Sequence, residues 1–326
     1  MISRRRLIKV SAASALAPAL LHHPALAQTW PNRHVRLVVP FPAGGGADAI
    51  ARIVGGRLSE MWGQQVTIEN RGGASGNLAA ENVAHSPPDG YTMFIAGDFQ
   101  AVNVFMFPKL NYHPINDFAP VSMVVQYTNA FVVPTSSPAK TVQEFIALAK
   151  SKQLTFASPG HGVSGHMAGE LFMREAGIKM TVVPYRGANP AIQDLIPGRV
   201  DSFANNLSPL ISLHQSKQVR ILALTTNWRS PQVPDVPTFA ESGLPKFDVP
   251  GWYSFFVPAK TPQAIVQKMT ADTIKVLGEP ATKKRLEDLG LRVIGSTAEQ
   301  LAQSLKADMG KWGPLIKAAG LSATAN

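Results

Sequence analysis

The sequence predicts an α/β protein built in two halves, with a ligand-binding cleft where the halves face one another. Two observations lead to this prediction. Segments with the pattern of strands and helices alternate along most of the chain. Each half also contains a glycine-rich turn, at residues 40–48 and 158–166, between an apolar strand and the start of a helix.

Both glycine-rich turns have the character of an anion-binding site. Glycine lets backbone N–H groups approach a ligand closely, because no side chain intervenes. The start of a helix adds donors without an intrahelical partner and a partial positive charge. Two such turns in two halves therefore predict a clamp around a small anion.

The first half reads as a parallel sheet with helical crossovers. Residues 35–39 form a predicted strand, and a helix opens at Asp48 with an apolar face. Short strands follow at 66–69 and 92–96, with a helix near 78–84 between them. Strand–helix–strand order of this kind favours right-handed crossovers and parallel pairing.

The second half repeats this alternation. A capping box at 141–144 opens a helix that runs to Lys150. Predicted strands then alternate with helices, and a Pro-rich connector and two C-terminal helices follow. The strands are at 154–157, 181–183, 200–204 and 219–225, the intervening helices follow 158–166 and span 191–196, the connector is 231–250, and the last helices open at 261–262 and 296–299.

The first 27 residues have the pattern of an export signal. A basic stretch at 3–9 contains a twin-arginine pattern, an apolar run follows at 10–21, and residues 25–27 form a small-residue cleavage site. This order predicts a Tat-type leader, with an ordinary Sec signal as the alternative. A retained membrane anchor is disfavoured, because the apolar run is shorter than the ~20 residues that a span needs.

Composition argues against several classes of function. The chain has no cysteine, which excludes disulfides and thiolate chemistry. The formal charge is +10, and four of the 31 basic residues lie in the leader, so 27 remain against 21 acidic residues, a net of +6. No basic run is interleaved with aromatic residues, which argues against nucleic-acid binding. The histidines outside the leader are scattered, and their spacing predicts no metal site.

The first glycine turn also permits a second interpretation. Gly44, Gly46 and Ala49 match a dinucleotide-binding fingerprint, and Glu69 ends the next strand at a suitable distance. An NAD-type oxidoreductase is therefore the alternative function, although Pro40 and Pro42 would widen a turn that must be tight. A further alternative is that the glycines serve only close strand-to-helix packing.

The second glycine turn does not match a nucleophile elbow. That motif requires glycine two residues after the serine, and His166 stands there in this chain. No acidic residue is placed to orient the imidazole. We therefore expect Ser164 and His166 to act as hydrogen-bond donors at a helix start.

The chain resembles a known family, the Bug-type periplasmic solute-binding receptors of tripartite tricarboxylate transporters. The matching stretches follow one another in order across nearly the whole chain after the leader. They are VVPFPAGG at 38–45, ENR at 69–71, PDGYT at 88–92, VPYRG at 183–187, DL at 194–195, GRVD at 198–201, PDVPT at 234–238 and PAKTP at 258–262.

The resemblance implies a two-lobed periplasmic-binding-protein (Venus flytrap) fold with a cleft between the lobes. It implies residues 28–128 plus 251–326 as the first lobe and residues 129–250, including the return connector, as the second. It further implies a periplasmic, monomeric receptor without catalysis, cofactor or metal, which captures a di-, tri- or aromatic carboxylate and delivers it to integral membrane transporter subunits. A sensor that presents its ligand to a membrane partner is an alternative within this picture.

The resemblance also implies where the ligand binds. The carboxylate would be held mainly by backbone N–H groups, helix ends and ordered waters. The predicted site residues are Phe41, Ala43, Gly44, Gly45 and Asp48 of the first loop; Ser158, Gly160, Gly162, Ser164 and His166 of the second; Tyr185, Arg186, Gly187, Asp201 and Asn205 of a third region; and Ser75 and Asn77 as additions. Residues 97–100 (GDFQ) depart from the small and hydroxyl residues usual in the family, which bears on specificity.

Overall fold

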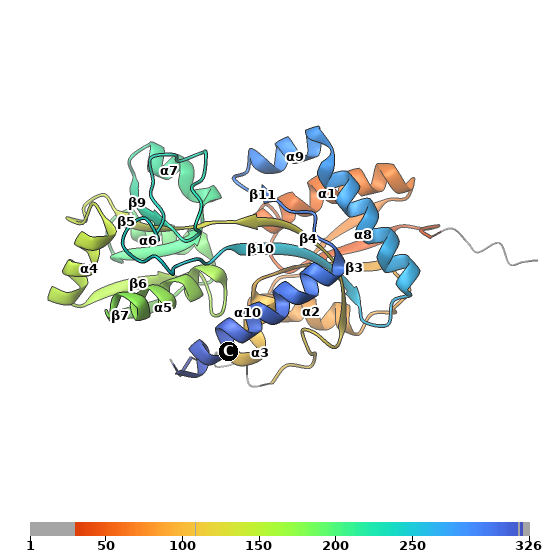
Figure 1. Cartoon of the computed structure of the whole chain (residues 1–326), viewed down its shortest axis with the longest axis horizontal. Helices are drawn as coiled ribbons and strands as arrows, with labels where there is room; N and C mark the ends of the chain where they lie inside the picture. The colour runs from red at the N-terminus through yellow and green to blue at the C-terminus, as the bar shows by residue number, and fades with distance from the viewer. Residues whose placement is uncertain (1–29, 108, 319, 322–326) are drawn as a thin grey trace, which may run out of the picture.

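The protein folds into two lobes, each built on its own β-sheet (Figure 1). The computed structural model describes residues 30–107, 109–318 and 320–321. The predicted export leader at 1–27 lies outside these residues. The predicted two-lobed α/β fold is confirmed.

The first lobe contains a six-stranded sheet in the order β11-β4-β10-β3-β1-β2. Its strands are β1 (Val35–Val39), β2 (Val66–Asn70), β3 (Thr92–Gly97), β4 (Phe118–Tyr127), β10 (Gly251–Pro258) and β11 (Arg292–Val293). The predicted parallel pairing holds for β1 with β2 and with β3. Strand β10 runs antiparallel to both β3 and β4, so the sheet is mixed.

Helices cover both faces of this sheet, because successive side chains of the strands alternate between two apolar layers. Val35, Leu37 and Val39 pack with α1, α8 and α9 on one face, whereas Val38 packs with α2, α3 and α10 on the other. The helices are α1 (Gly46–Trp62), α2 (Asn77–Ala84), α3 (Phe99–Met106), α8 (Gln263–Gly278), α9 (Pro280–Glu287) and α10 (Ala298–Ala318). Helix α1 begins two residues before Asp48, where the sequence analysis placed its start.

The second lobe contains a five-stranded sheet in the order β7-β6-β8-β5-β9. Its strands are β5 (Asn129–Pro134), β6 (Leu154–Ser158), β7 (Met180–Pro184), β8 (Ser202–Asn206) and β9 (Val219–Leu224), and its helices are α4 (Val142–Ser151), α5 (Ser164–Ala176), α6 (Ala188–Leu195) and α7 (Ile211–Gln215). Strand β6 pairs in parallel with β7 and β8, so the carboxyl ends of these strands share one edge of the sheet.

Two neighbouring chain segments connect the lobes. Only Thr128 separates β4 in the first lobe from β5 in the second, and residues 225–250 lead back to β10 (Figure 1). The segments are bonded where they cross: the Asn129 amide donates to Thr225 Oγ1 at 3.0 Å, and the Thr226 hydroxyl donates to Thr128 Oγ1 at 3.0 Å. This pairing places the crossing at the centre of the molecule.

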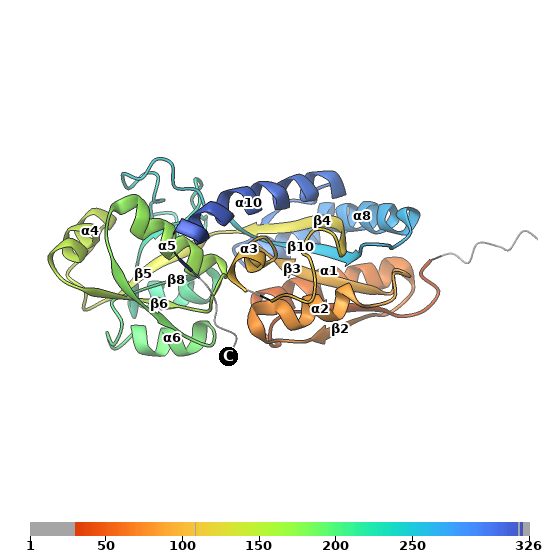
Figure 2. The same ribbon diagram turned by 90° about the horizontal axis from the view of Figure 1, so that it is seen from below.

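Helix α10 also spans the two lobes (Figure 2). Leu301 and Leu305 pack in the core of the first lobe, whereas Trp312, Leu315 and Ile316 pack in the core of the second. The C-terminal segment that the sequence analysis assigned to the first lobe thus contributes to both cores. Across the described residues, none of the helices combines the length and apolar character needed to cross a bilayer.

Phe239 links the return connector to the core of the second lobe. Its ring centroid lies 4.9 Å from that of Phe172 and 5.7 Å from that of Phe131, and the residue is 1% exposed. We expect Phe239→Ala to lower the free energy of unfolding by ~3–5 kcal/mol, because the cavity left by the ring cannot fully collapse. Urea-induced unfolding followed by circular dichroism measures this loss.

Leu78→Ala is the matched control for Phe239→Ala. Leu78 is 50% exposed, so its truncation should change the free energy of unfolding by no more than ~0.5 kcal/mol. Equal effects of the two substitutions would show that the connector does not belong to the core of the second lobe.

Candidate ligand-binding site

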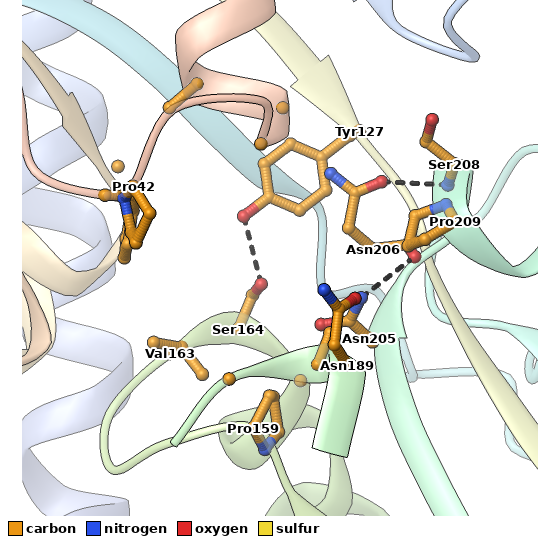
Figure 3. Close-up of a pocket in the computed structure, with 18 of the residues that line it drawn as sticks. Pro42, Tyr127, Pro159, Val163, Ser164, Asn189, Asn205, Asn206, Ser208 and Pro209 are labelled. Atoms are coloured by element: carbon orange, nitrogen blue, oxygen red, sulfur yellow. Dashed lines mark hydrogen bonds between the residues drawn. The ribbon is translucent and has the colours of Figure 1, made fainter. Parts of the chain in front are cut away.

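A cleft of about 760 Å³ lies between the lobes, lined by loops from both (Figure 3). The first lobe contributes the turn after β1, the turn after β3 and two tyrosines, Tyr127 and Tyr253. The second lobe contributes the starts of α5 and α6 and the end of β8. The lining residues are 41–47, 97–99, 127 and 253 of the first lobe and 159, 163–165, 186–190, 205, 206, 208 and 209 of the second.

Helices α1, α5 and α6 begin at this cleft without a side-chain cap, and so does α3, whose N-cap residue is Asp98. The N-cap residues are Gly45 for α1, Val163 for α5 and Gly187 for α6, and none of them makes a capping hydrogen bond. Glycine and valine have no side-chain acceptor to offer. A missing cap is not peculiar to the cleft, since α8 and α9 begin elsewhere and also lack one, whereas in α4 the Thr141 hydroxyl accepts from the Glu144 amide at 3.2 Å. What distinguishes the helices at the cleft is that their uncapped starts line a shared cavity.

The missing caps leave backbone donors free at the cleft. The first intrahelical bond of α1 runs from the Ala49 amide to the Gly45 carbonyl, and that of α5 from the Met167 amide to the Val163 carbonyl. The amides that precede Ala49 and Met167 in these turns have no acceptor within the helix. Because α1 belongs to the first lobe and α5 to the second, unpaired N–H groups face the cleft from both sides.

The glycines of these loops meet specific backbone requirements. Gly44 has φ of +85° and Gly187 has φ of +110°, values that disfavour any residue with a side chain. A Cβ atom on Gly165 would collide with the carbonyl oxygen of Ala204. Glycine at this position therefore lets the start of α5 lie directly against β8.

Asp48 anchors the first loop and does not line the cleft. Its carboxylate accepts from the Gly44 amide at 2.9 Å, from Asn70 Nδ2 at 3.0 Å and from the Arg52 guanidinium at 2.9 and 3.0 Å. Burial raises the pKa of Asp48, but the bonds from Arg52, Gly44 and Asn70 outweigh burial and hold the pKa below its usual value. The Gly44 amide is thereby committed to Asp48 and gives the turn its shape.

The structure brings eight of the predicted site residues to the cleft. These are Phe41, Ala43, Gly44, Gly45, Ser164, Arg186, Gly187 and Asn205. The other predicted residues, which the cleft lining does not include, are Asp48, Ser75, Asn77, Ser158, Gly160, Gly162, His166, Tyr185 and Asp201.

Within the second turn, the predicted residues bond to one another. The Ser158 hydroxyl donates to the Gly160 carbonyl at 3.0 Å, and the Gly162 amide donates to His166 Nδ1 at 3.2 Å. Gly162 also lies against the first lobe, since a Cβ atom there would be 2.9 Å from Asn103 Oδ1 on α3. These contacts fold the turn and bring it against α3.

In the third region, the predicted acid and tyrosine bind neighbouring elements. Asp201 accepts from both the amide and the hydroxyl of Thr155 at 2.8 Å, which joins β8 to β6. The Tyr185 hydroxyl donates to the Asp194 carboxylate on α6 at 2.8 Å. Tyr185 thus holds α6 in place beside the cleft, whereas Asp201 joins the amino ends of β6 and β8, at the edge of the sheet opposite the cleft.

Ser75 and Asn77 belong to a buried network at the start of α2. The Asn103 side-chain amide donates to the Ser75 carbonyl at 3.0 Å and to Asn77 Oδ1 at 2.8 Å. The Tyr112 hydroxyl donates to Asn77 Oδ1 at 2.7 Å. These bonds secure α2 and α3 next to the cleft.

The sequence analysis missed several residues that line the cleft. Tyr127 ends β4, and its hydroxyl lies 3.0 Å from Ser164 Oγ across the cleft, as Figure 3 shows. Asn206 ends β8, and its Oδ1 accepts from the Ser208 amide at 3.0 Å. Its Nδ2 group therefore points toward Gly46 at the start of α1. For Asn206 the available signal was a polar residue just after the predicted strand at 200–204, whereas no strand was predicted to end at Tyr127.

We expect Asp48→Asn to destabilise the protein at pH 7, because the amide cannot accept all the bonds that hold the loop. Each buried donor left unpaired costs ~1–3 kcal/mol. Since the folded-state pKa of Asp48 is lowered, its stabilisation is present above the unfolded value of ~4 and is lost as pH falls through the folded value. The stability difference from the wild type should therefore shrink below about pH 4.

Thermal unfolding of the wild type and of Asp48→Asn from pH 7 to pH 2 measures this difference. Asp288→Asn is the control, since Asp288 pairs with Lys284 on the exposed face of α9 and contributes at most ~1 kcal/mol. A stability difference for Asp48→Asn that stays constant with pH would contradict the assigned charge of Asp48.

Comparisons with known proteins agree on one family. The family model described as "Tripartite tricarboxylate transporter family receptor" matches residues 50–321. A Pseudomonas sp. (strain P51) protein from the tcbD-tcbE intergenic region is 36% identical over 97% of this chain and 94% of its own. Protein BugT of Bordetella pertussis is 29% identical over 94% and 95%.

Solved structures show the same fold. The R. palustris protein Rpa4515 with adipate has a TM-score of 0.84 and 34% identity, over 90% of this chain and 100% of its own. MatC from Rhodopseudomonas palustris with bound malate has a TM-score of 0.80 and 34% identity, over 88% and 99%. The periplasmic binding protein BugD has a TM-score of 0.81 and 29% identity, over 90% and 100%.

These matches extend over nearly the whole described chain and concern receptors, so they decide between the two functions that the glycine turns permitted. The family binds solutes and does not consist of dehydrogenases. The resemblance drawn from the sequence is confirmed: this chain belongs to the family of tripartite tricarboxylate transporter receptors.

Proposed function

We propose that this protein is a periplasmic receptor that captures a small carboxylate between its lobes and delivers it to an integral membrane transporter. One observation carries the proposal: helices α1 and α3 of the first lobe and α5 and α6 of the second begin at a single cleft, and none has a side-chain cap. Unpaired N–H groups and the positive ends of helices favour a negative group at this point.

The energy of such an arrangement is sufficient for useful affinity. A hydrogen bond to a charged group contributes ~1.5–3 kcal/mol. Each helix terminus adds ~0.3–2 kcal/mol. Micromolar binding requires ~8 kcal/mol, after the cost of ordering ligand and protein. A few backbone bonds to one carboxylate therefore account for binding without an arginine pair.

Related proteins support a carboxylate as the ligand. The structures with adipate and with malate are both 34% identical to this chain. Both ligands are small dicarboxylates, which is the class of anion that two facing helix starts would hold. We assign the direct contacts to the predicted residues that line the cleft, except Gly44, whose amide is bonded to Asp48, together with Tyr127 and Asn206.

The remaining features follow from this role. We propose that residues 1–27 direct export, that 28–128 plus 251–326 and 129–250 form the two lobes, and that the protein acts as a monomer without nucleic acid or metal. The remaining predicted residues then do not touch the ligand: Asp201 joins β8 to β6 away from the cleft, and the loops beside the cleft are shaped by Asp48, Ser75, Asn77, Ser158, Gly160, Gly162, His166 and Tyr185. The periplasm is the compartment in which such a receptor meets its transporter.

A thermal-shift screen tests the proposal directly. We expect at least one of succinate, glutarate, adipate, malate, citrate, benzoate and their amino derivatives to raise the melting temperature. A ligand at 100 times its dissociation constant adds ~2.7 kcal/mol to the stability of the folded state. NADH belongs in the screen as the control for the alternative function, and we expect no shift with it.

Asn206→Asp should abolish most of the binding found in this screen. Asn206 Nδ2 lies near Gly46 at the start of α1, so an aspartate there would place a carboxylate where the ligand carboxylate binds. We expect at least a ~10-fold loss of affinity by calorimetry, which is ~1.4 kcal/mol. Asn116→Asp adds the same charge on a loop outside the cleft and should leave affinity unchanged. Equal affinities for both variants would refute the proposed position of the ligand.

A further inference from the structure

Asp98 is the one acidic residue that lines the cleft within the described chain, and Arg186 is the one basic residue. Asp98 follows β3 and precedes α3. It also lines a small cavity behind the cleft, of about 20 Å³, together with Asp308 and Lys311 of α10. Asp98 therefore separates the ligand cleft from the region where α10 crosses between the lobes.

Asp98 is hydrogen-bonded across the cleft. The Tyr127 hydroxyl donates to Asp98 Oδ2 at 3.2 Å and lies 3.0 Å from Ser164 Oγ. The Ser164 hydroxyl in turn lies 3.2 Å from Asn129 Oδ1. Because Asp98 and Tyr127 belong to the first lobe and Ser164 to the second, this chain of polar groups lies on the floor of the cleft.

No cation pairs with Asp98 among the ion pairs of the described residues. Two other acids beside the cleft loops do have cationic partners. Asp48 pairs with Arg52 at 2.9 Å, and Asp194 pairs with Arg199 at 2.8 Å. Lys311 shares the small cavity, but its Nζ donates to the Asp248 carbonyl at 2.6 Å. A carboxylate in such a place is costly unless a positive group reaches it.

The raised pKa of Asp98 agrees with its buried position and its lack of a cationic partner among the described residues. Burial raises the pKa of Asp98 to about 7, and the nearby Asp308 carboxylate adds to the rise, against the bonds from Ser164, Tyr127 and the Phe99 amide. The titratable groups that face Asp98 from neighbouring elements are Tyr127 of β4, Tyr253 of β10, Asp308 and Lys311 of α10, and Arg186 across the cleft. Asp98 is thus the group whose charge changes near neutral pH at the floor of the cleft.

We propose that Asp98 determines the specificity of this receptor by binding an ammonium group of the ligand. The inference rests on the proposed function, since the helix starts hold the ligand carboxylate while Asp98 binds the cationic end. Amino-substituted carboxylates are then the preferred ligands. A second ligand carboxylate at this position would meet a like charge, which disfavours simple dicarboxylates.

The proposal sets the direction of the pH dependence. An ammonium ligand favours ionised Asp98, so its affinity rises from pH 6 to pH 8. A dicarboxylate that reaches Asp98 favours the protonated acid, so its affinity falls over the same range, by up to about tenfold per pH unit. Asp98→Asn removes the titrating group, so both affinities become independent of pH in this window.

The test compares ligands of equal chain length by calorimetry. The panel is glutarate, 5-aminopentanoate and glutamate, with adipate, 6-aminohexanoate and 2-aminoadipate as the second set, each measured at pH 6, 7 and 8. We expect the wild type to prefer an amino-bearing member at pH 8 by at least ~10-fold, and Asp98→Asn to lose at least that factor of preference. Circular dichroism and thermal unfolding establish that Asp98→Asn is folded.

Asp308→Asn is the matched control, because Asp308 lines the small cavity but not the cleft. Its preference among the ligands at pH 8 should change less than threefold, because Asp98 is already mostly ionised there and loss of the Asp308 charge only lowers the pKa of Asp98 further. A wild type that binds dicarboxylates at least as tightly as amino carboxylates, or an Asp98→Asn variant with unchanged preference and pH dependence, would overturn the role of Asp98 and leave the receptor function intact. Absence of binding for every member of this panel and of the thermal-shift screen would overturn the receptor function, and the role of Asp98 with it.

Discussion

The site depends on backbone N–H groups that the fold leaves without partners. A folded chain pairs nearly all of its buried amides, so unpaired donors persist only where solvent or a ligand reaches them. The chain produces them by following the strands β1, β6 and β7 with glycine-rich turns and helices that lack a capping side chain. Because parallel strands bring their carboxyl ends to one edge, the helix starts in each lobe face the same cleft.

The local part of this arrangement could be predicted from the sequence. The turns at 40–48 and 158–166 can be recognised by their high glycine content, and the apolar segments beside them predict the neighbouring strands. Several predicted residues that reach the cleft lie at a helix start, such as Gly45 and Ser164, whereas Asn205 reaches it from the end of β8. Those that do not, such as Asp48 and Asp201, are polar groups that neighbouring donors occupy, and a sequence does not show which partner a carboxylate has.

Contacts between the lobes could not be predicted in the same way. Tyr127 and Asn206 each end a strand, and the apolar pattern of a strand predicts only that its side chains are buried. Their position at the cleft depends on how the two sheets are oriented relative to each other. The position of α10 could not be predicted for the same reason. An amphipathic pattern does not show that one end of a helix packs on the first lobe and the other end on the second. Such features follow from the crossing at Thr128 and at residues 225–250, which fixes the relative position of the sheets.

Two aspartates that follow strands of the first lobe show how hydrogen-bond and ion-pair partners determine what a carboxylate does. Asp48 follows β1 and is surrounded by donors, which keep it charged and bind it to its own loop. Asp98 follows β3 and meets hydroxyl groups and another acid, so its negative charge has no cationic partner among the described residues. A satisfied carboxylate stabilises the loop that presents the backbone amides. An unsatisfied one leaves an attraction for a positive group, which on our proposal the ammonium group of a ligand in the cleft supplies.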